Sequence, residues 1–192
     1  MGKKITIKYS IEFHTDWHCG SGLAAGADVD ALVVKDKNNM PFVPGKTMKG
    51  LVREAAEELR CLPDKSFVNV FGYFEKDKEE MQKGSMFFTN AELGKEEYDA
   101  IVSNDASRFM YRNIASTAIG EDGIAKEHSL RKMELVVPCT LYGTIHDVPE
   151  GMADEIIKSL GFIKRLGQNR NRGLGRCTIT AVERKEDSHE NA

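Results

Sequence analysis

Hydrophobic and polar residues alternate strictly near the start of the chain. The hydrophobic set between residues 3 and 13 is Ile5, Ile7, Tyr9, Ile11 and Phe13. Because successive side chains of a strand point to opposite faces, this pattern predicts a half-buried β-strand. Apolar runs bounded by turn residues predict further strands at residues 31–34, 42–43, 84–89, 134–146 and 177–182. Pro138 lies inside the run 134–146 and indicates an edge strand or a bulge there.

Two other stretches repeat their hydrophobic residues every three or four positions, as one face of an amphipathic helix does. The first follows the turn Pro44-Gly45, is expected to end near residues 60–63, and carries Met48, Leu51, Val52, Ala55, Ala56 and Leu59. The second follows Pro149 and carries Ala153, Ile156, Ile157, Leu160 and Ile163. Residues 67–74 are interpreted as an apolar connection, residues 95–111 fit a helix or a loop, and residues 113–132 fit a protruding loop or hairpin.

This order of strands and helices favours an α+β fold, a ferredoxin-like (RNA-recognition-motif-like) sandwich. We expect a single domain over residues 1–184, with an inserted thumb hairpin near residues 108–133. The polar residues 185–192 are expected to form a disordered tail.

The composition is that of an ordinary globular protein, since 41% of the 192 residues are hydrophobic and 30% are charged. The sequence has no hydrophobic run long enough to span a membrane, and its N-terminus lacks the pattern of a secretory signal. Its four cysteines are far apart and form no CxxC motif, which argues against a zinc ribbon or a redox pair. These features predict a cytoplasmic protein with reduced, buried thiols.

The distribution of charge says more than the net charge of −3. That net charge argues mildly against a protein that coats nucleic acid by bulk electrostatics. Residues 164–176, however, contain no acid and carry five cations, namely Lys164, Arg165, Arg170, Arg172 and Arg176. A basic stripe on an acidic body suits an anionic partner held in one groove.

Two segments have residues suited to binding phosphate. Helix N-termini bind anions, and Lys46, Lys49 and Arg53 follow the turn at Pro44-Gly45, although a solvated basic face explains them as well. In the glycine-rich loop 166–176, arginines can clamp phosphates while the backbone approaches closely, although they can also be solvated charges. The tripeptide 45–47 is not a nucleotide-binding P-loop, because position 40 is a methionine where that motif needs glycine.

Residues 14–30 form a long loop with three glycines, the single tryptophan and several potential ligands. His14, Asp16 and His18 alternate, so they could bind a metal or act as acid and base, or they could be plain polar loop residues. Asp30, at the end of this loop, could hold a divalent ion or orient a 2′-hydroxyl, or it could close an Asx-turn.

Three segments carry a family resemblance. Residues 43–53 resemble the Pro-Gly-Ser-Ser-(apolar)-Lys-Gly-(apolar)-(apolar)-Arg signature of the RAMP superfamily of CRISPR-associated proteins, with Lys46-Thr47 in place of the usual Ser-Ser. Residues 18–22 look like the family's early Gly-Ser-Gly loop, and residues 166–176 look like its C-terminal glycine-rich loop. The matches lie in the expected order within residues 3–182, and the sequence is most similar to the backbone subunit of type III effector complexes.

The resemblance implies roles for particular residues. An aspartate before the central motif cuts target RNA with a divalent metal in that subunit, which points to Asp30 as catalytic residue and ligand of a divalent metal, such as Mg²⁺. Asp28 and His18 are the alternates, and Tyr111 is the candidate for base stacking at the thumb. The RNA-binding residues would be Gly20, Ser21, Gly22, Lys46, Thr47, Lys49, Arg53, Arg170, Arg172, Gly173, Gly175 and Arg176.

The resemblance therefore implies a guide-RNA-binding backbone subunit of a type III CRISPR ribonucleoprotein in antiviral defence. It would act as a metal-dependent endoribonuclease on target RNA only within the assembled complex. Its partners would be guide RNA, target RNA, other effector subunits and copies of itself, with no membrane. The alternatives are a non-catalytic RAMP subunit of the same complex, a guide-processing endoribonuclease, and an unrelated ferredoxin-like binding module.

Overall fold

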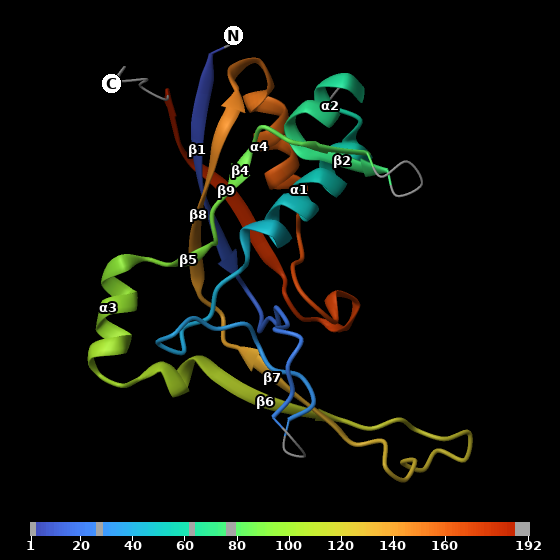
Figure 1. Cartoon of the computed structure of the whole chain (residues 1–192). Coiled ribbons are helices and arrows are strands. Elements are labelled where there is room, and N and C mark those ends of the chain that lie inside the picture. Colours follow the sequence, from blue (N-terminus) through green and yellow to red (C-terminus); the bar gives the residue numbers. More distant parts are fainter. Residues whose placement is uncertain (1–2, 26–28, 62–63, 76–79, 187–192) are drawn as a thin grey trace.

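The computed structural model describes residues 3–25, 29–61, 64–75 and 80–186. Its centre is an antiparallel sheet with the strand order β4-β8-β1-β9 (Figure 1). These strands span β1 Lys4–Phe13, β4 Phe87–Phe88, β8 Thr140–Pro149 and β9 Cys177–Glu186. A further short strand, β5 Glu92–Leu93, also pairs with β8. The alternation predicted for the first strand is confirmed, because the hydrophobic side of β1 is buried.

Two helices cover one face of this sheet (Figure 1). Helix α1 spans Gly45–Leu59, and helix α4 spans Ala153–Phe162 after the short 3-10 helix η2, Glu150–Met152. Along the chain these elements follow in the order β1, α1, β4, β8, α4, β9, and in the sheet β1 lies between β8 and β9. This arrangement is ferredoxin-like. The predicted α+β fold class is confirmed.

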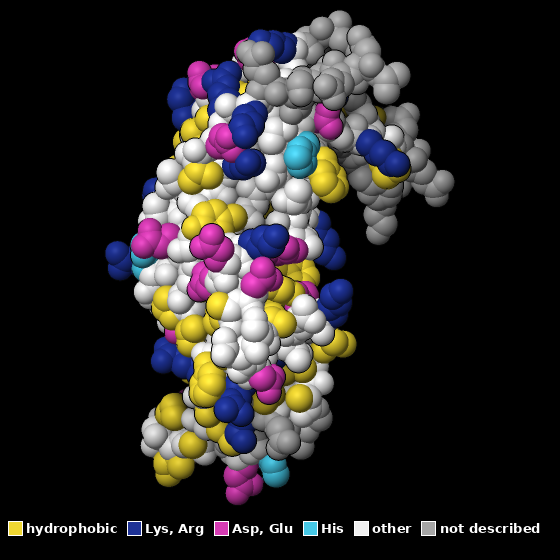
Figure 2. Space-filling model, turned by 90° about the vertical axis from the view of Figure 1, so that its left-hand side faces the viewer, with side chains coloured by type: hydrophobic (Ala, Val, Ile, Leu, Met, Phe, Trp, Pro, Cys, Tyr) yellow, Lys and Arg dark blue, Asp and Glu magenta, His cyan; other side chains and the backbone are white. Residues whose placement is uncertain are grey.

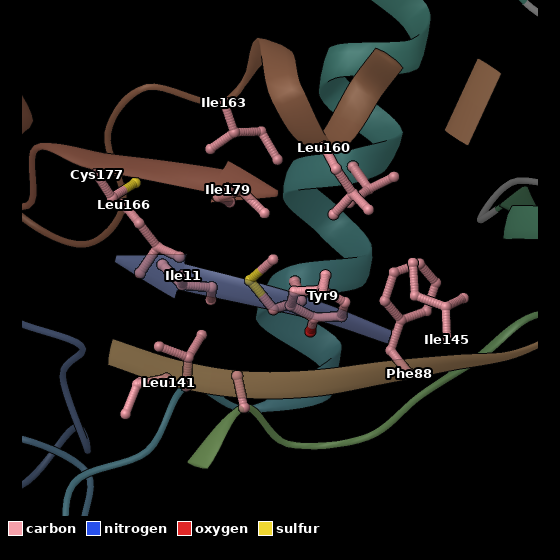
Figure 3. Packing of buried hydrophobic residues seen from close by; sticks show 14 of the residues in the cluster. Tyr9, Ile11, Phe88, Leu141, Ile145, Leu160, Ile163, Leu166, Cys177 and Ile179 are labelled. Carbon is pink, nitrogen blue, oxygen red and sulfur yellow. The ribbon is translucent and has the colours of Figure 1, made fainter. Parts of the chain in front are cut away.

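The core lies between the sheet and the two helices, as Figure 3 shows for a part of it. Tyr9 and Ile11 of β1 meet Leu141 and Ile145 of β8, and Leu160 of α4 covers them from the helical side. All four cysteines are free thiols, and burial raises the pKa of Cys139 and of Cys177 to about 11. These thiols therefore stay protonated and unreactive at neutral pH.

Two insertions leave this core. The first contains helix α2 Asp64–Phe71 and the hairpin of β2 Gly72–Glu75 with β3 Glu80–Lys83. The second contains helix α3 Lys95–Ser103, the 3-10 helix η1 Ser107–Met110, and the hairpin of β6 Tyr111–Ser116 with β7 Arg131–Val136. The β6–β7 hairpin projects away from the sheet (Figure 1), as expected for residues 113–132.

Several predicted elements are wrong in extent. Residues 67–74 are helix and strand instead of a connection, because Phe67, Val70 and Phe71 recur at helical spacing and Gly72 then takes a positive φ. The single strand expected at 134–146 is divided into β7 and β8 around Pro138. Residues 31–34 and 42–43 form only isolated bridges, and β4 is shorter than expected. Strand β9 includes residues 185 and 186 of the expected tail, and residues 187–192 lie outside the described residues.

One side of the molecule carries no large patch of a single charge sign. Figure 2, which shows the side at the left of Figure 1, has cations and carboxylates intermixed with scattered hydrophobic side chains. Among the described residues, no helix is long and apolar enough to cross a membrane. Because cations and carboxylates are mixed on this side, an anion would meet cations there only in small local groups.

Candidate functional site

The segment that carries Asp30 pairs with the base of the β6–β7 hairpin. Ala31 forms a parallel bridge with Met133 of β7, and the Asp30 N–H donates to the Lys132 carbonyl at 2.9 Å. On its other side the segment pairs with the early glycine loop through an antiparallel bridge between Gly20 and Val33. Asp30 is thus fixed to strand β7 and not to the central sheet.

The carboxylate of Asp30 is exposed and has one free oxygen. Its Oδ2 accepts the backbone N–H of Lys132 at 2.7 Å. Among the described residues, no donor forms a hydrogen bond with Oδ1. A backbone contact that orients one oxygen and leaves the other toward solvent is suited to a carboxylate that binds a proton or a cation.

A groove of about 630 Å³ opens in front of Asp30, and we call it the Asp30 groove. It is lined by Asp30, Ala31, Ile114, Ser116, Arg131, Lys132, Met133, Gln168, Asn169, Arg172 and Leu174. The hairpin supplies one wall and the glycine-rich loop supplies the other. A second hollow of about 480 Å³, which shares Ser116, Arg131 and Arg172, extends it along the hairpin.

Three cations and one carboxylate set the electrostatics of the Asp30 groove. Arg131, Lys132 and Arg172 are exposed, and none of them forms an ion pair with another residue that the structure describes. Among the described lining residues, Asp30 is the single carboxylate. The groove is therefore suited to a phosphate chain passing beside a carboxylate.

Backbone constraints place Arg172 in this groove. Gly175 has a φ of +67°, and a Cβ there would lie 1.8 Å from the carbonyl oxygen of Leu166. The Gly175 N–H donates to the Asp16 carbonyl at 2.7 Å, which closes the glycine-rich loop onto the residues after β1. Between these anchors the short 3-10 helix η3, Arg170–Arg172, turns toward the hairpin. Arg172 thereby reaches the groove. Arg170 shares a hollow on the glycine-rich loop with Arg172 and also lines a hollow beside α1, whereas Arg176 lines none of these.

The cations of helix α1 lie in a different place. Lys49 and Arg53 line a hollow of about 470 Å³ between α1 and the β2–β3 hairpin, together with Lys83. Burial, and then the charge of Arg53, lowers the pKa of Lys49. Two cations that lie this close together favour an anion between them. The structure thus separates the predicted RNA-binding residues of α1 from Arg172.

The start of helix α1 is partly occupied by the protein itself. A Cβ on Gly45 would lie 2.1 Å from the carbonyl oxygen of Phe88, so only glycine lets the helix approach β4 this closely. The Gly45 N–H donates to Asn90 Oδ1 at 3.1 Å. Lys46 is exposed, whereas Thr47 is half-buried. Of the predicted anion site at this helix start, Lys46 is the part left open to solvent.

Other predicted site residues hold the structure together. Ser21 Oγ donates to the Leu32 carbonyl at 3.0 Å, and Gly20 and Gly22 belong to the same loop behind the Asp30 segment. Tyr111 donates its hydroxyl to the Asn39 carbonyl at 2.6 Å, and the Lys35 ammonium lies 3.9 Å from its ring centre. Burial, and then the charges of Glu134 and Asp36, raises the pKa of Tyr111. The Lys35 ammonium covers one face of the ring, and the hydroxyl ties the start of β6 to residue 39, so Tyr111 anchors the hairpin.

The two alternates to Asp30 have different outcomes. His18 has 0% exposed surface, so as a catalytic residue it does not fit the structure. Its Nδ1 instead lies 2.7 Å from the Glu134 carbonyl oxygen. Asp16 of the same early loop is also buried and forms an ion pair with Arg112 of β6. Asp28 lies outside the described residues.

The donor set fits a magnesium ion only when RNA supplies further ligands. Among the described residues, no group of three or more His, Cys, Asp or Glu side chains could hold a metal ion. Mg²⁺ is commonly held by one or two carboxylates together with waters and substrate phosphates. Asp30 supplies one such carboxylate, so an ion there would be shared with the phosphates of bound RNA.

Comparisons with known proteins identify the family. A family model described as the RAMP superfamily matches residues 10–178, and the chain therefore belongs to the RAMP superfamily, as its motifs predicted. Its fold is similar to a chain in the cryo-EM structure of the type III-B Cmr-beta bound to cognate target RNA, with a TM-score of 0.71, 13% identity, and coverage of 94% of this chain and 98% of that chain. It is also similar to a chain in the apo-state structure of the type III-B Cmr-beta, with a TM-score of 0.72, 12% identity, and coverage of 93% and 97%. No curated protein matches the sequence.

Sequence reasoning missed three residues of this site. Arg131 and Lys132 line the Asp30 groove, and Glu134 lies buried directly behind it. The adjacent basic pair at the end of the predicted hairpin was a usable signal for the first two. No local pattern marks Glu134, because its importance comes from the distant residues that it contacts.

Proposed function

We propose that this chain is a guide-RNA-binding, backbone-type subunit of a type III CRISPR effector ribonucleoprotein and cleaves bound target RNA. Its partners would be guide RNA, target RNA, other effector subunits and copies of itself in the cytoplasm. The observation that carries the proposal is the Asp30 groove, where the base of a projecting hairpin places one carboxylate beside Arg131, Lys132 and Arg172. Both similar solved structures belong to a type III-B Cmr-beta complex, one of them bound to target RNA.

RNA binding would use the two separated sets of cations. Arg131 and Arg172 would bind phosphates of the strand in the Asp30 groove. Lys49 and Arg53 would bind phosphates of RNA that runs along α1. Contacts of this kind recognise the phosphate backbone and carry no sequence information, as required of a protein that holds guides of any sequence.

Cleavage would use the 2′-hydroxyl of the target RNA as the nucleophile. The Lys132 N–H holds Asp30 Oδ2, which leaves Oδ1 to accept the proton of that hydroxyl. The O2′–P bond then forms and the P–O5′ bond breaks. O5′ takes a proton from solvent water and Asp30 releases its proton to solvent, which leaves a 2′,3′-cyclic phosphate and a 5′-hydroxyl. Arg131 and Arg172 would stabilise the charge that develops on the phosphate oxygens. A magnesium ion held by Asp30 and the RNA would polarise that phosphate.

The first test is to purify the protein from cells carrying a matching CRISPR array and to sequence the RNA that accompanies it. Guide-derived RNA of graded length supports the proposed backbone subunit, and RNA-free protein contradicts it. In the assembled complex, Asp30→Asn should lower the rate of target cleavage by about 10²–10⁴-fold while target binding is kept, the range for loss of a general base.

A matched control for that variant is Asp99→Asn, which removes an exposed carboxylate on α3 far from the groove. It should cleave like the wild-type complex. If Asp30→Asn also cleaves normally while guide RNA is bound, the chain is a non-catalytic subunit and the cleavage proposal is wrong.

A further inference from the structure

A buried carboxylate lies directly behind the Asp30 groove. Glu134 of β7 is 9% exposed and follows Lys132, the residue that binds Asp30, by two positions. A buried charge is costly unless it is paired and hydrogen-bonded. Glu134 Oε1 accepts the Lys35 ammonium at 2.7 Å, and Oε2 accepts the Val33 N–H at 3.1 Å.

The contact between Glu134 and Val33 takes the place of a backbone–backbone hydrogen bond between the Asp30 segment and β7. Asp30 and Ala31 are held to β7 by backbone hydrogen bonds, from the Asp30 N–H to the Lys132 carbonyl at 2.9 Å and from the Glu134 N–H to the Ala31 carbonyl at 3.0 Å. At Val33 the N–H is taken by the Glu134 side chain instead of a β7 carbonyl. Since Val33 is 2% exposed, its N–H would otherwise be a buried donor without a partner.

The backbone of Glu134 extends the same cluster to the glycine-rich loop. His18 Nδ1 lies 2.7 Å from the Glu134 carbonyl oxygen, so the imidazole donates from Nδ1. The His18 carbonyl in turn accepts the Gln168 N–H at 2.9 Å, and Gln168 lines the Asp30 groove. Glu134 therefore connects the Asp30 segment, the hairpin and the opposite wall of the groove.

Lys35, which follows the Asp30 segment in the chain, links this cluster to β6, the other strand of the hairpin. Its ammonium bonds to Glu134 and lies 3.9 Å from the ring centre of Tyr111, the first residue of β6. The segment with Asp30 is thus tied to both hairpin strands through polar contacts.

We propose that Glu134 is a positioning residue, which holds the Asp30 segment and the β6–β7 hairpin as a single unit so that the hairpin carries Asp30 to the target strand. This inference rests on the proposed cleavage of target RNA. Glu134 touches neither RNA nor the reacting atoms, and it acts through Val33 and the β7 backbone.

The test compares Glu134→Ala with Glu134→Gln in the assembled complex. A glutamine oxygen can still accept the Val33 N–H, whereas alanine leaves it without a partner. In Glu134→Ala, kcat for target cleavage should fall about 10- to 100-fold, in the range expected for a displaced catalytic group, with target affinity and guide content unchanged. Glu134→Gln should restore most of the rate. Glu127→Ala, an exposed hairpin glutamate, should match wild type.

Hydrogen exchange separates failure of this inference from failure of the proposed function. The Val33 amide should exchange faster in Glu134→Ala than in Glu134→Gln, while amides of β1 keep their protection. Unchanged cleavage and unchanged Val33 exchange in Glu134→Ala, with Asp30→Asn inactive, overturn the positioning role and leave the proposed function intact.

If Asp30→Asn and Glu134→Ala both cleave normally, the proposed cleavage is wrong and Val33 exchange alone decides whether Glu134 holds the segment. Lys35→Met disturbs the same cluster from a second position, in case Glu134→Ala fails to assemble. It should also accelerate Val33 exchange, and wild-type exchange in Lys35→Met overturns the inference.

Discussion

Different forces hold the central sheet and the base of the β6–β7 hairpin. Between the sheet and its helices almost all buried side chains are apolar, as at Ile7, Ile145 and Leu160, and Ser159 of α4 is the polar exception among the described residues. At the hairpin base the buried groups include Glu134, His18 and Asp16, which are held by hydrogen bonds and ion pairs. The sheet and its helices are thus stabilised mainly by removal of apolar area from water, and the hairpin base mainly by hydrogen bonds and ion pairs, although His18 Nε2 is buried without a partner among the described residues.

This difference matters because the two contributions respond differently to change. Apolar contacts are non-directional, so the sheet tolerates small shifts of its side chains. Hydrogen bonds are directional, so the groove has a defined geometry that is lost when one partner is removed. A site that must place Asp30 near one phosphate benefits from the second kind of contact.

The largest difference in stability between the two regions is expected from a substitution in the core. Ile145→Ala in β8 should lower the free energy of unfolding by about 2–5 kcal/mol, because Ile145 is fully buried and alanine leaves a cavity. Ile124→Ala in the hairpin should change it by no more than about 0.5 kcal/mol, since that side chain is 66% exposed. Chemical denaturation of both variants measures the difference. Equal losses would show that the hairpin belongs to the same cooperative core.

A pair of glycine variants tests the wall of the Asp30 groove. Both Gly173 and Gly175 have a positive φ, but only Gly175 would bring a Cβ against backbone. Gly173→Ala should cost about 1–2 kcal/mol from the left-handed conformation alone. Gly175→Ala should cost about 2–4 kcal/mol, because a steric clash is added. Thermal unfolding checks the order, and an equal cost at the two positions would contradict the close packing on Leu166.

The smallest effect is expected from a single cation of the groove. Arg172→Ala should weaken binding of RNA of any sequence and reduce the slope of log K against log salt by about 0.7–0.9, the value of one phosphate contact. Arg184→Ala serves as the control, because Arg184 is an exposed cation of β9 paired with Asp154. Titrations at several salt concentrations measure the slope. An unchanged slope in Arg172→Ala would rule out a phosphate contact there.

The sequence predicted the ferredoxin-like core well because its elements are periodic. The alternation in β1 and the apolar faces of α1 and α4 are local patterns that also decide which side is buried. The short pieces were predicted poorly. Residues 31–34 have hydrophobic side chains, but their pairing partners lie in the distant segments 19–25 and 132–134, so they form single bridges and no strand.

The candidate site shows the same division. Asp30 and Arg172 could be named from motifs, and the structure brings them to one groove. The predicted site residues do not all lie in this groove. Lys49 and Arg53 face the β2–β3 hairpin. The early glycine loop pairs with the Asp30 segment through Gly20 and Val33. His18 was assigned a possible role in chemistry, whereas its burial makes it a structural contact.

By itself the sequence determined the RAMP family, the α+β core and the presence of two basic segments, since each depends on residues close together in the chain. Tertiary structure alone decided which cations share a groove with Asp30, that Tyr111 is covered by Lys35, and that Glu134 holds the Asp30 segment. These contacts join residues that are far apart in the chain, as Val33 and Glu134 are, 101 residues from each other. The energy of such contacts depends on burial and geometry that exist only after the hairpin and the glycine-rich loop have packed together.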